Sequence, residues 1–437
     1  MKVLFIDMSQ DALPAALRAR DAGHEVKIYC RPRGGKMPLP GRGMVPRVAE
    51  WEPHMRWADL ILLTGNSMYA ERLEWYFDHG FPIIGANKKS AALELDRGHG
   101  EEILQRFGIP VIPSQCFDGL AAAIEHVKNA GKTYVVKTWG GTDDKASSFV
   151  SSSPADMVFT LEKWRREGKR GQVMLQEKVK GIEMACAGWF GPGGFSEDVR
   201  EIFEEKKFLN DGLGQNTGEM GTIMRYTRKS KLFERILRPL EGYLAGLNYV
   251  GNVDVNCIID EEGTPWPLEF TTRFGWPGYN LEMALHTGDP VQWLRDLWDG
   301  RDTLRVREGV CVGVVMAHGD FPMCSAPAEE AAGYPITGIT AGMEPHIWPH
   351  GVMYGQAPID FRGGVTTTQT LVTAEQCVMT VTGVGPTVED ARTLAYDRVW
   401  KINWPSNRMF RTDIGKRLEK QLPTLHSLGY AKGLSYA

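Results

Sequence analysis

The sequence predicts an α/β protein of several domains whose N-terminal part is a doubly wound parallel sheet. Within residues 1–100, short apolar stretches alternate with helical patterns, as expected for strands covered by helices on both faces. The 437 residues correspond to roughly three domains at about 150 residues each. Hydrophobic residues make up 43% and charged residues 24%, so the chain can bury large cores and is neither disordered nor collagen-like. The elements expected here are strands at 2–6, 25–30, 59–64 and 82–85 and helices at 11–22 and 70–79.

Composition argues against several classes of function. A formal net charge of −4 does not suit a dedicated nucleic-acid-binding protein. The longest apolar runs, 60–63 and 310–317, are too short to span a membrane, and the acid at position 7 makes the first residues a predicted strand rather than a signal peptide. Seven cysteines without a C-x-x-C spacing argue against a disulfide framework or a structural zinc site. We therefore expect a cytoplasmic enzyme without a membrane or nucleic-acid partner.

Breaks in the pattern divide the chain into four segments. A helical pattern at 89–107 ends at Gly108, and the I-P-V-I-P that follows stops a helix, which places the first boundary. The third segment contains a polar, Gly-rich loop at 211–221, and a strand at 310–317 opens the last one. The expected segments are 1–108, 109–183, 184–310 and 311–437. Further expected elements are helices at 119–131, 154–167, 231–247 and 387–401, and strands at 134–138, 148–152, 173–177, 251–259 and 266–270.

Markers of several common enzyme classes are missing from the sequence. It contains no G-x-x-x-x-G-K-[ST], no H-E-x-x-H and no G-x-S-x-G. The turn after the first strand lacks the Gly-rich dinucleotide fingerprint and contains Asp7 and Asp11 instead, which argues against a nicotinamide enzyme.

Two segments have features of a nucleotide site. Lys137 ends an apolar strand and precedes the Gly-rich turn at 140–145, so it could hold polyphosphate together with Lys145. A strand-end lysine beside an exposed hairpin is an equally good interpretation. The string Q-E-K-V-K-G-I-E at 176–183 could pair with an adenine through backbone groups, although many strands end in such polar residues.

Asp254 and Glu269 form a candidate metal site. Both lie in otherwise apolar strands that flank the hairpin turn at 260–263, and adjacent antiparallel strands can bring two carboxylates together. Buried like charges are costly unless a cation or proton offsets them, and Mg²⁺ commonly takes one or two carboxylates plus substrate phosphates. The alternative is that Asp254 caps a turn or pairs with Arg273 while Glu269 faces water.

Several strings resemble the phosphoribosylamine–glycine ligase (glycinamide ribonucleotide synthetase) family of the ATP-grasp superfamily. G-Q-N-T-G-E-M-G at 214–221 is similar to that family's G-P-N-T-G-G-M-G, and L-E-F-T-T-R-F-G-W-P at 268–277 resembles its E-F-N-x-R-F-G-D-P. Further matches are F-G-I-P-V-I-P at 107–113, V-V-K at 135–137, V-T-G-V-G-P-T-V-E-D-A at 381–391 and R-T-D-I-G at 411–415. The resemblance implies a two-part ATP-grasp fold and a small C-terminal α+β domain after the N-terminal sheet.

The same resemblance implies roles for individual residues. ATP would bind at Lys137, Lys145, Glu177, Val179 and Glu183, with Lys145 in a loop that departs from the family's G-K-G. Catalysis would involve Lys206, Asn216 and Arg273, and Arg273 would face the transferred phosphate. The acceptor site would include Thr217, Gly218 and Glu219. Magnesium would bind Glu269, and Asp254 resembles the aspartate that other ATP-grasp ligases use for metal.

Departures from the family concentrate on the sugar-phosphate side. The family's phosphate-cradling G-N-G-G-R-E-H is replaced by D-M-S-Q-D-A-L at 7–13, and its G-P-E-A-P-L by T-G-N-S-M-Y at 64–69. Glu219 replaces a glycine, Thr271 replaces the metal-binding asparagine, and W-P-G at 276–278 replaces D-P-E. The basic loop at 31–47 is either a replacement anion pocket or simply a solvated surface.

From these observations we expect an ATP-dependent carboxylate–amine ligase that works through an acyl phosphate with Mg²⁺, or Mn²⁺. Glycine is the default carboxylate on the resemblance alone, and we expect phosphoribosylamine to be a poor amine substrate. Expected partners are small-molecule amino acids and amines, and the expected state is a monomer or homodimer. The alternative is a degenerate ATP-grasp protein that binds nucleotide in a regulatory or scaffold role.

Overall fold

The structure, a computed structural model, describes residues 1–8, 11–33, 35–138 and 149–437. These residues form two compact units. The larger unit comprises Met1–Gly100, Met184–Asn256 and Glu269–Ala437, and the smaller unit comprises Glu101–Glu183 and Cys257–Leu268. None of the helices in the described part of the chain combines the length and the apolar character needed to cross a membrane. The division into four segments stays a prediction.

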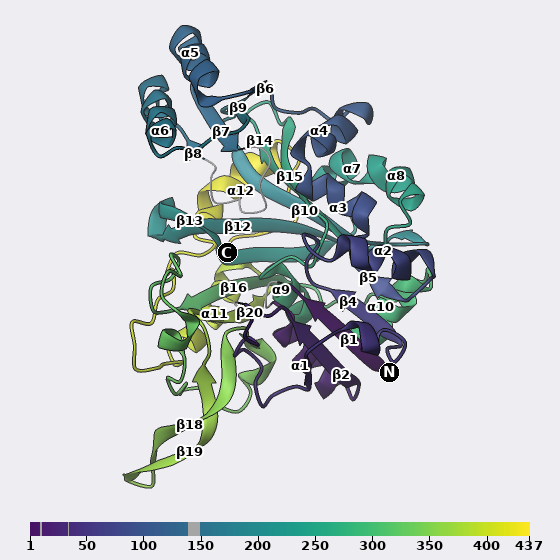
Figure 1. The fold of residues 1–437 in the computed structure, drawn as a ribbon, viewed down its shortest axis with the longest axis vertical. Coiled ribbons are helices and arrows are strands. Elements are labelled where there is room, and N and C mark those ends of the chain that lie inside the picture. Colours follow the sequence, from purple (N-terminus) through teal and green to yellow (C-terminus); the bar gives the residue numbers. More distant parts are fainter. Residues whose placement is uncertain (9–10, 34, 139–148) are drawn as a thin grey trace. The chain divides into compact units, whose positions relative to one another are not determined.

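The N-terminal sheet is parallel, as predicted. In the described part of the chain its strands lie in the order β3-β2-β1-β4-β5, with β1 paired in parallel to β2 and to β4 (Figure 1). Leu4, Ile6 and Ile61 of the central strands are buried on one face together with Trp51 and Leu73. The bounds are β1 Lys2–Asp7, α1 Leu13–Asp21, β2 Glu25–Cys30, β3 Arg47–Val48, β4 Leu60–Leu63, α2 Ala70–Asp78, β5 Ile83–Ile84, α3 Lys88–Leu95 and α4 Arg97–Arg106.

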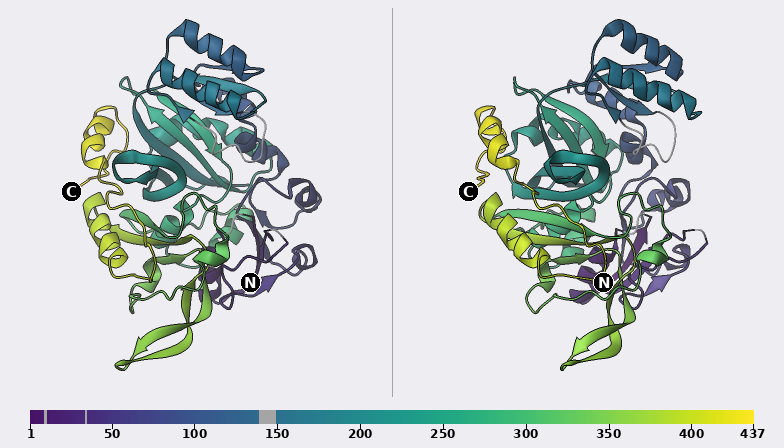
Figure 2. Two further views of the ribbon diagram at one scale, coloured as in Figure 1. Left: turned by 60° about the vertical axis from the view of Figure 1, so that its left-hand side comes forward. Right: turned by 90° about the vertical axis from the view of Figure 1, so that its left-hand side faces the viewer.

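A second, mainly antiparallel sheet contains most of the predicted site residues. Its order along the described strands is β15-β14-β10-β12-β13-β16-β20-β17, and β11 pairs with β10. Helix α11 packs against β16 and β20 (Figure 2). The bounds are β10 Ile182–Gly191, β11 Gly194–Phe195, β12 Val199–Leu209, β13 Leu213–Thr227, α7 Lys231–Ile236, α8 Glu241–Gly246, β14 Gly251–Ile259, β15 Pro265–Thr271, α9 Gly278–Leu285, α10 Pro290–Trp298, β16 Val310–Ala317, β17 Ile347–Pro349, β20 Cys377–Gly385, α11 Val388–Val399 and α12 Leu418–Ser427.

The smaller unit has a four-stranded antiparallel sheet among its described residues, in the order β6-β9-β7-β8. Its core joins helix residues such as Ile124, Met157 and Leu161 to Val136 and Leu175 of the sheet. The bounds are β6 Ser114–Phe117, α5 Leu120–Ala130, β7 Tyr134–Thr138, β8 Phe149–Val150, α6 Pro154–Arg166 and β9 Val173–Glu177.

Three expected elements differ in the structure. The helix expected at 89–107 is two helices, because Asp96 leaves the helical conformation and its carboxylate accepts a hydrogen bond from the His99 N–H at the start of α4. The helix expected at 231–247 is interrupted by a 3₁₀ turn at Arg238–Leu240, where Pro239 lacks an N–H to donate. The polar loop expected at 211–221 belongs largely to β13, because pairing with the backbone of β12 does not require apolar side chains.

A two-stranded hairpin completes the larger unit. Strands β18 (Val352–Phe361) and β19 (Gly364–Thr373) pair over ten residues and extend away from the other strands of the unit (Figures 1 and 2). Near its base, the Tyr354 N–H donates to the carbonyl of Arg42 in the 31–47 loop. Arg362 lies exposed in the turn at its tip.

Candidate functional site

The N-T-G-E string at 216–219 lies in an irregular part of the β12–β13 hairpin. Between the pairs Glu205–Gly221 and Lys207–Asn216, β12 advances two residues, from 205 to 207, while β13 advances five, from 221 to 216. The extra residues of β13 therefore bulge out opposite Lys206. The Thr217 hydroxyl donates to the carbonyl of Lys206 at 2.9 Å. The bulge thus places the predicted acceptor residues and the predicted catalytic lysine side by side.

Lys206 lies among carboxylates. Its Nζ is 2.8 Å from Oε2 of Glu204 and 3.7 Å from Oε1 of Glu269. Glu204 also accepts a hydrogen bond from the side-chain amide of Asn256, at 2.7 Å. Asp254 of β14 is 9% exposed, and its pKa is raised well above the usual value by burial and by the charge of Glu204, against the opposing charges of Arg200 and Lys206. The structure thus groups two predicted metal ligands around one lysine.

This arrangement fits a divalent cation that is completed by substrate phosphates. A buried carboxylate beside a second carboxylate gains stability from a nearby positive charge. In the described residues no group of three or more His, Cys, Asp or Glu side chains is arranged to hold a metal by itself. Mg²⁺ commonly binds one or two carboxylates together with phosphate oxygens and water, so Asp254 and Glu269 suit it. The strands that contain them, β14 and β15, are neighbours in the sheet.

Arg273 is held by a buried acid that the sequence analysis did not single out. Glu94 of α3 is buried and accepts hydrogen bonds from Nε of Arg273 at 3.0 Å, from the Asn66 amide at 2.7 Å and from the Thr272 N–H at 2.9 Å. Burial alone would lower the pKa of Arg273, but the charge and hydrogen bond of Glu94 together with the charges of Asp11 and Glu269 outweigh burial, so the pKa is raised. Glu94 contacts Arg273 through Nε, so this contact does not use the two terminal nitrogens of the guanidinium, which can also donate to an anion. The sequence feature that could have revealed this acid is a glutamate within the otherwise apolar string A-A-L-E-L at 91–95.

An aromatic side chain lies beside the acceptor string. A Cβ added to Gly218 would lie 3.6 Å from the ring of Trp276. The Trp276 indole N–H donates to the ring nitrogens of His350 at 3.1–3.2 Å, and Asn280 contacts the same imidazole at 3.0 Å. Burial lowers the pKa of His350 to about 3, so this imidazole is neutral. The wall beside Gly218 is therefore aromatic and uncharged, whereas Glu219 is buried on the same strand.

The N-terminus of helix α1 holds a carboxylate of the protein itself. Asp7, which is 1% exposed, accepts hydrogen bonds from the backbone N–H groups of Asp11 at 3.1 Å and Ala12 at 3.0 Å. The Thr64 hydroxyl donates to the same carboxylate at 2.8 Å. A helix N-terminus after the first strand is a ready-made anion site, and here the side chain of Asp7 supplies the anion.

Three basic side chains of the loop at 31–47 contact other groups of the protein. Arg33 pairs with Glu375 at 3.6 Å, and Lys36 pairs with Glu329 at 3.6 Å. Arg47 donates to carbonyls of its own loop. These contacts favour the interpretation of the loop as a structural surface rather than a replacement anion pocket.

The predicted nucleotide residues lie at strand ends of the smaller unit and at the start of β10. Lys137 is in β7 and pairs with Met174 of β9. Glu177 ends β9, where its N–H donates to the Pro113 carbonyl and its carboxylate is 2.6 Å from Nζ of Lys132. Val179 and Glu183 follow at the entry to β10. Lys145 and the Gly-rich turn around it lie outside the described residues.

Two family models match the chain. The one described as "Phosphoribosylglycinamide synthetase, ATP-grasp (A) domain" matches residues 96–279, and "Phosphoribosylglycinamide synthetase, C domain" matches residues 311–417. Together they cover about two thirds of the chain. The chain belongs to the phosphoribosylglycinamide synthetase family. It is therefore an ATP-grasp ligase that forms a C–N bond.

Curated relatives and solved structures agree with this family. A phosphoribosylamine–glycine ligase from Allochromatium vinosum is 27% identical over 363 residues, which span 78% of this chain and 79% of that protein. The corresponding ligase from Ralstonia nicotianae is 28% identical over 360 residues, spanning 77% and 79%. The crystal structure of a Thermotoga maritima phosphoribosylamine–glycine ligase superposes with a TM-score of 0.70 at 21% identity, covering 95% of this chain and all of that one. A Campylobacter jejuni biotin carboxylase superposes with a TM-score of 0.62 at 13% identity, covering 99% and 96%, which shows a shared fold.

The structure brings some of the predicted site residues of this chain together. Lys206, Glu269 and Arg273 are brought into one unit by β12, β15 and the residues that follow β15. Asp7 and Trp276 lie where the resemblance implies a phosphate-cradling loop and an acid in the family. Local sequence patterns do not reveal Glu94 or His350, because both contact partners that are distant in the sequence. Glu204 is two residues from Lys206, but its contact with Asn256 is likewise distant in the sequence.

Proposed function

We propose that this member of the phosphoribosylglycinamide synthetase family joins the carboxylate of an amino acid to an amine other than phosphoribosylamine. Glycine is the default carboxylate. A carboxylate oxygen attacks the γ-phosphate of ATP, ADP leaves, and an acyl phosphate results. The amine nitrogen then attacks the acyl carbon and inorganic phosphate leaves. Catalysis of such transfers depends mainly on positioning and on neutralising charge.

The residues have distinct parts in this proposal. Glu269 and Asp254 would hold Mg²⁺, or Mn²⁺, which offsets phosphate charge when it is bound. Arg273, held at its Nε by Glu94, presents its terminal nitrogens to the transferred phosphate. ATP would be bound by Lys137 and Lys145 at the phosphates and by Glu177, Val179 and Glu183 at the nucleoside. Thr217, Gly218 and Glu219 would line the acceptor side, with Lys206 and Asn216 beside them.

The acceptor assignment rests on one observation, the carboxylate of Asp7 at the start of α1. A phosphate monoester carries a charge of about −1.5 to −2 and needs donors or cations around it. The two N–H groups that would serve it, those of Asp11 and Ala12, already donate to Asp7. A sugar phosphate placed here would lose those donors and meet an uncompensated carboxylate. An uncharged or cationic amine would meet no such penalty.

The test separates carboxylate activation from amine choice. Purified protein with Mg-ATP, glycine and hydroxylamine should release ADP and form glycine hydroxamate, because hydroxylamine captures an acyl phosphate whatever the natural amine is. A panel of amines in place of hydroxylamine, with phosphoribosylamine among them, then reports the acceptor. Phosphoribosylamine converted as efficiently as the best amine of the panel would contradict the acceptor assignment.

A second candidate is a nucleotide-binding protein without ligase turnover, with a regulatory or scaffold role. Thr271 favours it, because threonine stands where the family has a metal-binding asparagine. Tight binding of Mg-ATP together with no ADP release across a panel of amino acids and amines would select this candidate. For either function we propose a cytoplasmic protein that works as a monomer or homodimer.

A further inference from the structure

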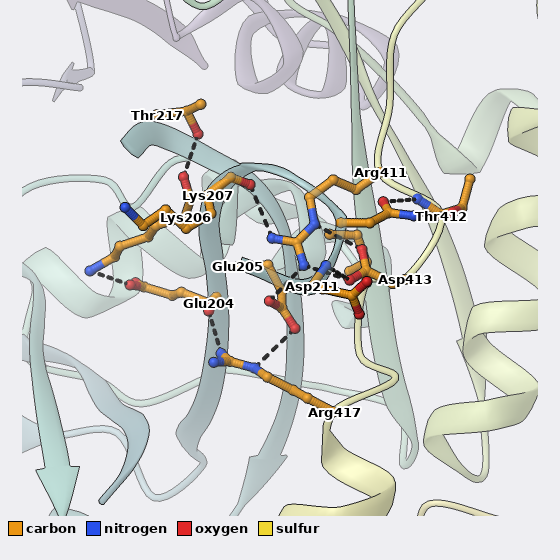
Figure 3. Close-up of polar contacts among 12 residues, drawn as sticks. Glu204, Glu205, Lys206, Lys207, Asp211, Thr217, Arg411, Thr412, Asp413 and Arg417 are labelled. Atoms are coloured by element: carbon orange, nitrogen blue, oxygen red, sulfur yellow. Dashed lines mark hydrogen bonds and ion pairs between the residues drawn. The ribbon is translucent and has the colours of Figure 1, made fainter. Parts of the chain in front are cut away.

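The backbone on either side of Lys206 is held by side chains rather than by strand pairing alone. Opposite the bulge of β13, the carbonyls of three β12 residues within positions 204–207 accept hydrogen bonds from side chains (Figure 3). The Glu204 carbonyl accepts from Arg417 at 2.5 Å, the Lys206 carbonyl from Thr217 at 2.9 Å and the Lys207 carbonyl from Arg411 at 3.0 Å. Two of these three donors come from the R-T-D-I-G region near the C-terminus.

Arg411 contacts three different groups at once. It is 3% exposed, and its Nη1 donates to the Lys207 carbonyl. Its Nη2 donates to Oε2 of Glu205 at 3.2 Å and to Asp413 at 2.9 Å, and Nε donates to the other oxygen of Asp413 at 2.8 Å. These four hydrogen bonds leave from three nitrogens spread over the guanidinium plane, which the single ammonium nitrogen of lysine cannot reproduce.

Glu205 also forms an ion pair with the second arginine, Arg417. Arg417 lies 3.0 Å from Oε1 of Glu205, on the opposite oxygen from Arg411. Burial raises the pKa of Glu205, and the charges of Arg417 and Arg411 oppose that rise. Glu205 thus accepts a hydrogen bond from Arg411 and forms an ion pair, without a hydrogen bond, with Arg417, so one buried carboxylate attracts both guanidinium groups.

The turn of the β12–β13 hairpin forms hydrogen bonds with Thr412 and Asp413. Asn210 and Thr412 exchange two hydrogen bonds, at 2.6 and 3.1 Å. The N–H of Asp211, a residue with a φ of 58°, donates to Asp413 at 2.8 Å. Residues 411–417 therefore contact the β12–β13 hairpin from residue 204 to its turn.

We propose that Arg411 and Arg417 are positioning residues that hold the bulge of the β12–β13 hairpin and thereby aim Lys206 at Glu204 and Glu269. The proposal rests on the proposed function, in which Lys206 lies in the ligase site. The two arginines do not contact substrate. They hold the carbonyls of Glu204 and Lys207, which flank Lys206, so the lysine cannot turn away from the carboxylates without breaking buried contacts. A shift of about 1 Å in a catalytic group costs on the order of 10²-fold in rate.

The test compares Arg411→Lys with wild type by two independent readouts. The first is glycine hydroxamate formation, from which kcat and the KM for ATP are obtained. The second is the rate at which Lys206 is acetylated by a water-soluble reagent in the protein without nucleotide, measured by peptide mass spectrometry. We expect kcat to fall about 10- to 100-fold with the KM for ATP changed less than about threefold. We expect acetylation of Lys206 to become several-fold faster, because the lysine leaves its carboxylate partners.

Arg362→Lys is the matched control, because Arg362 is exposed in the turn between β18 and β19. It should match wild type in both readouts. Unchanged acetylation of Lys206 in folded Arg411→Lys would overturn the proposal, and so would a fall in kcat matched by an equal rise in the KM for ATP. If Arg411→Lys does not fold, Thr217→Val removes the donor to the Lys206 carbonyl at the hairpin itself and decides by the same two criteria. If wild type forms no hydroxamate, the proposed function fails, and the acetylation rates alone decide whether the arginines position Lys206.

Discussion

Replacing Asp7 by alanine should destabilise the N-terminal sheet and open an anion site at helix α1. The side chain fills the position that an external anion would take, and it accepts two backbone hydrogen bonds and one from the Thr64 hydroxyl. Asp7→Ala removes all three acceptor contacts at once. The N–H groups of Asp11 and Ala12 then become available to a ligand.

The magnitude follows from the contacts that are lost. Loss of a capping carboxylate costs about 0.5–2 kcal/mol. The Thr64 hydroxyl is buried and would be left without its acceptor, which costs about 1–3 kcal/mol more. We therefore expect Asp7→Ala to lower the free energy of unfolding by about 1.5–5 kcal/mol. Inorganic phosphate at 100 times its dissociation constant would restore about 2.7 kcal/mol.

Urea unfolding followed by tryptophan fluorescence measures both effects, because Trp51 is buried in the same core. Asp21→Ala is the control: it lies at the other end of α1, and its carboxylate is largely exposed. Phosphate should raise the unfolding midpoint of Asp7→Ala and leave wild type and control unchanged. A loss below about 1 kcal/mol, or an equal response of all three proteins to phosphate, would refute the assignment of Asp7 as an internal anion.

Three further predictions follow from the site. Glu269→Gln should abolish ADP release while the unfolding midpoint stays within a few degrees of wild type, and appreciable turnover would remove Glu269 from the metal site. Lys137→Ala should weaken binding of ATP in calorimetry and lower the rate by about two to three orders of magnitude if the lysine also stabilises the transition state; unchanged affinity would contradict its role. His350 has a pKa lowered from 6.5 to about 3, so only the unfolded chain takes up its proton as the pH falls through 6.5. Its contribution to stability is complete above pH 6.5 and declines toward pH 3 by about 1.4 kcal/mol per pH unit. His350→Gln should reduce this slope in urea unfolding between pH 7 and 4.5, and an unaltered slope would show that another group is responsible.

Local patterns predicted much of the fold. The parallel N-terminal sheet follows from four apolar stretches whose alternation with helices allows few other arrangements. The break at Asp96 was missed because an internal capping residue resembles any other polar position on a helix face. The first part of β13 was missed because its side chains are polar and exposed, and only its pairing with β12 makes it a strand.

The site was predictable where a motif stays within a few residues, and not elsewhere. Glu269 and Arg273 are in one string, so their proximity follows from the sequence. Glu94 contacts Arg273 across 179 positions, and such contacts depend on the packing of a whole unit. Asp7 was identified as a departure from a family pattern, but its role as a helix cap appears only when the Asp11 and Ala12 N–H groups are seen to donate to it.

The contacts between residues 411–417 and the β12–β13 hairpin affect the order in which parts of the protein can fold during synthesis. Arg411 meets Glu205 across 206 positions, so the hairpin leaves the ribosome long before its anchors exist. The parallel sheet at the start of the chain can form early, because its strands are close in sequence. The hairpin that contains Lys206 can make these contacts only after residues 411–417 have been synthesised. A chain that ends before residue 411 would therefore lack the contacts that hold Lys206, even where its N-terminal sheet has formed.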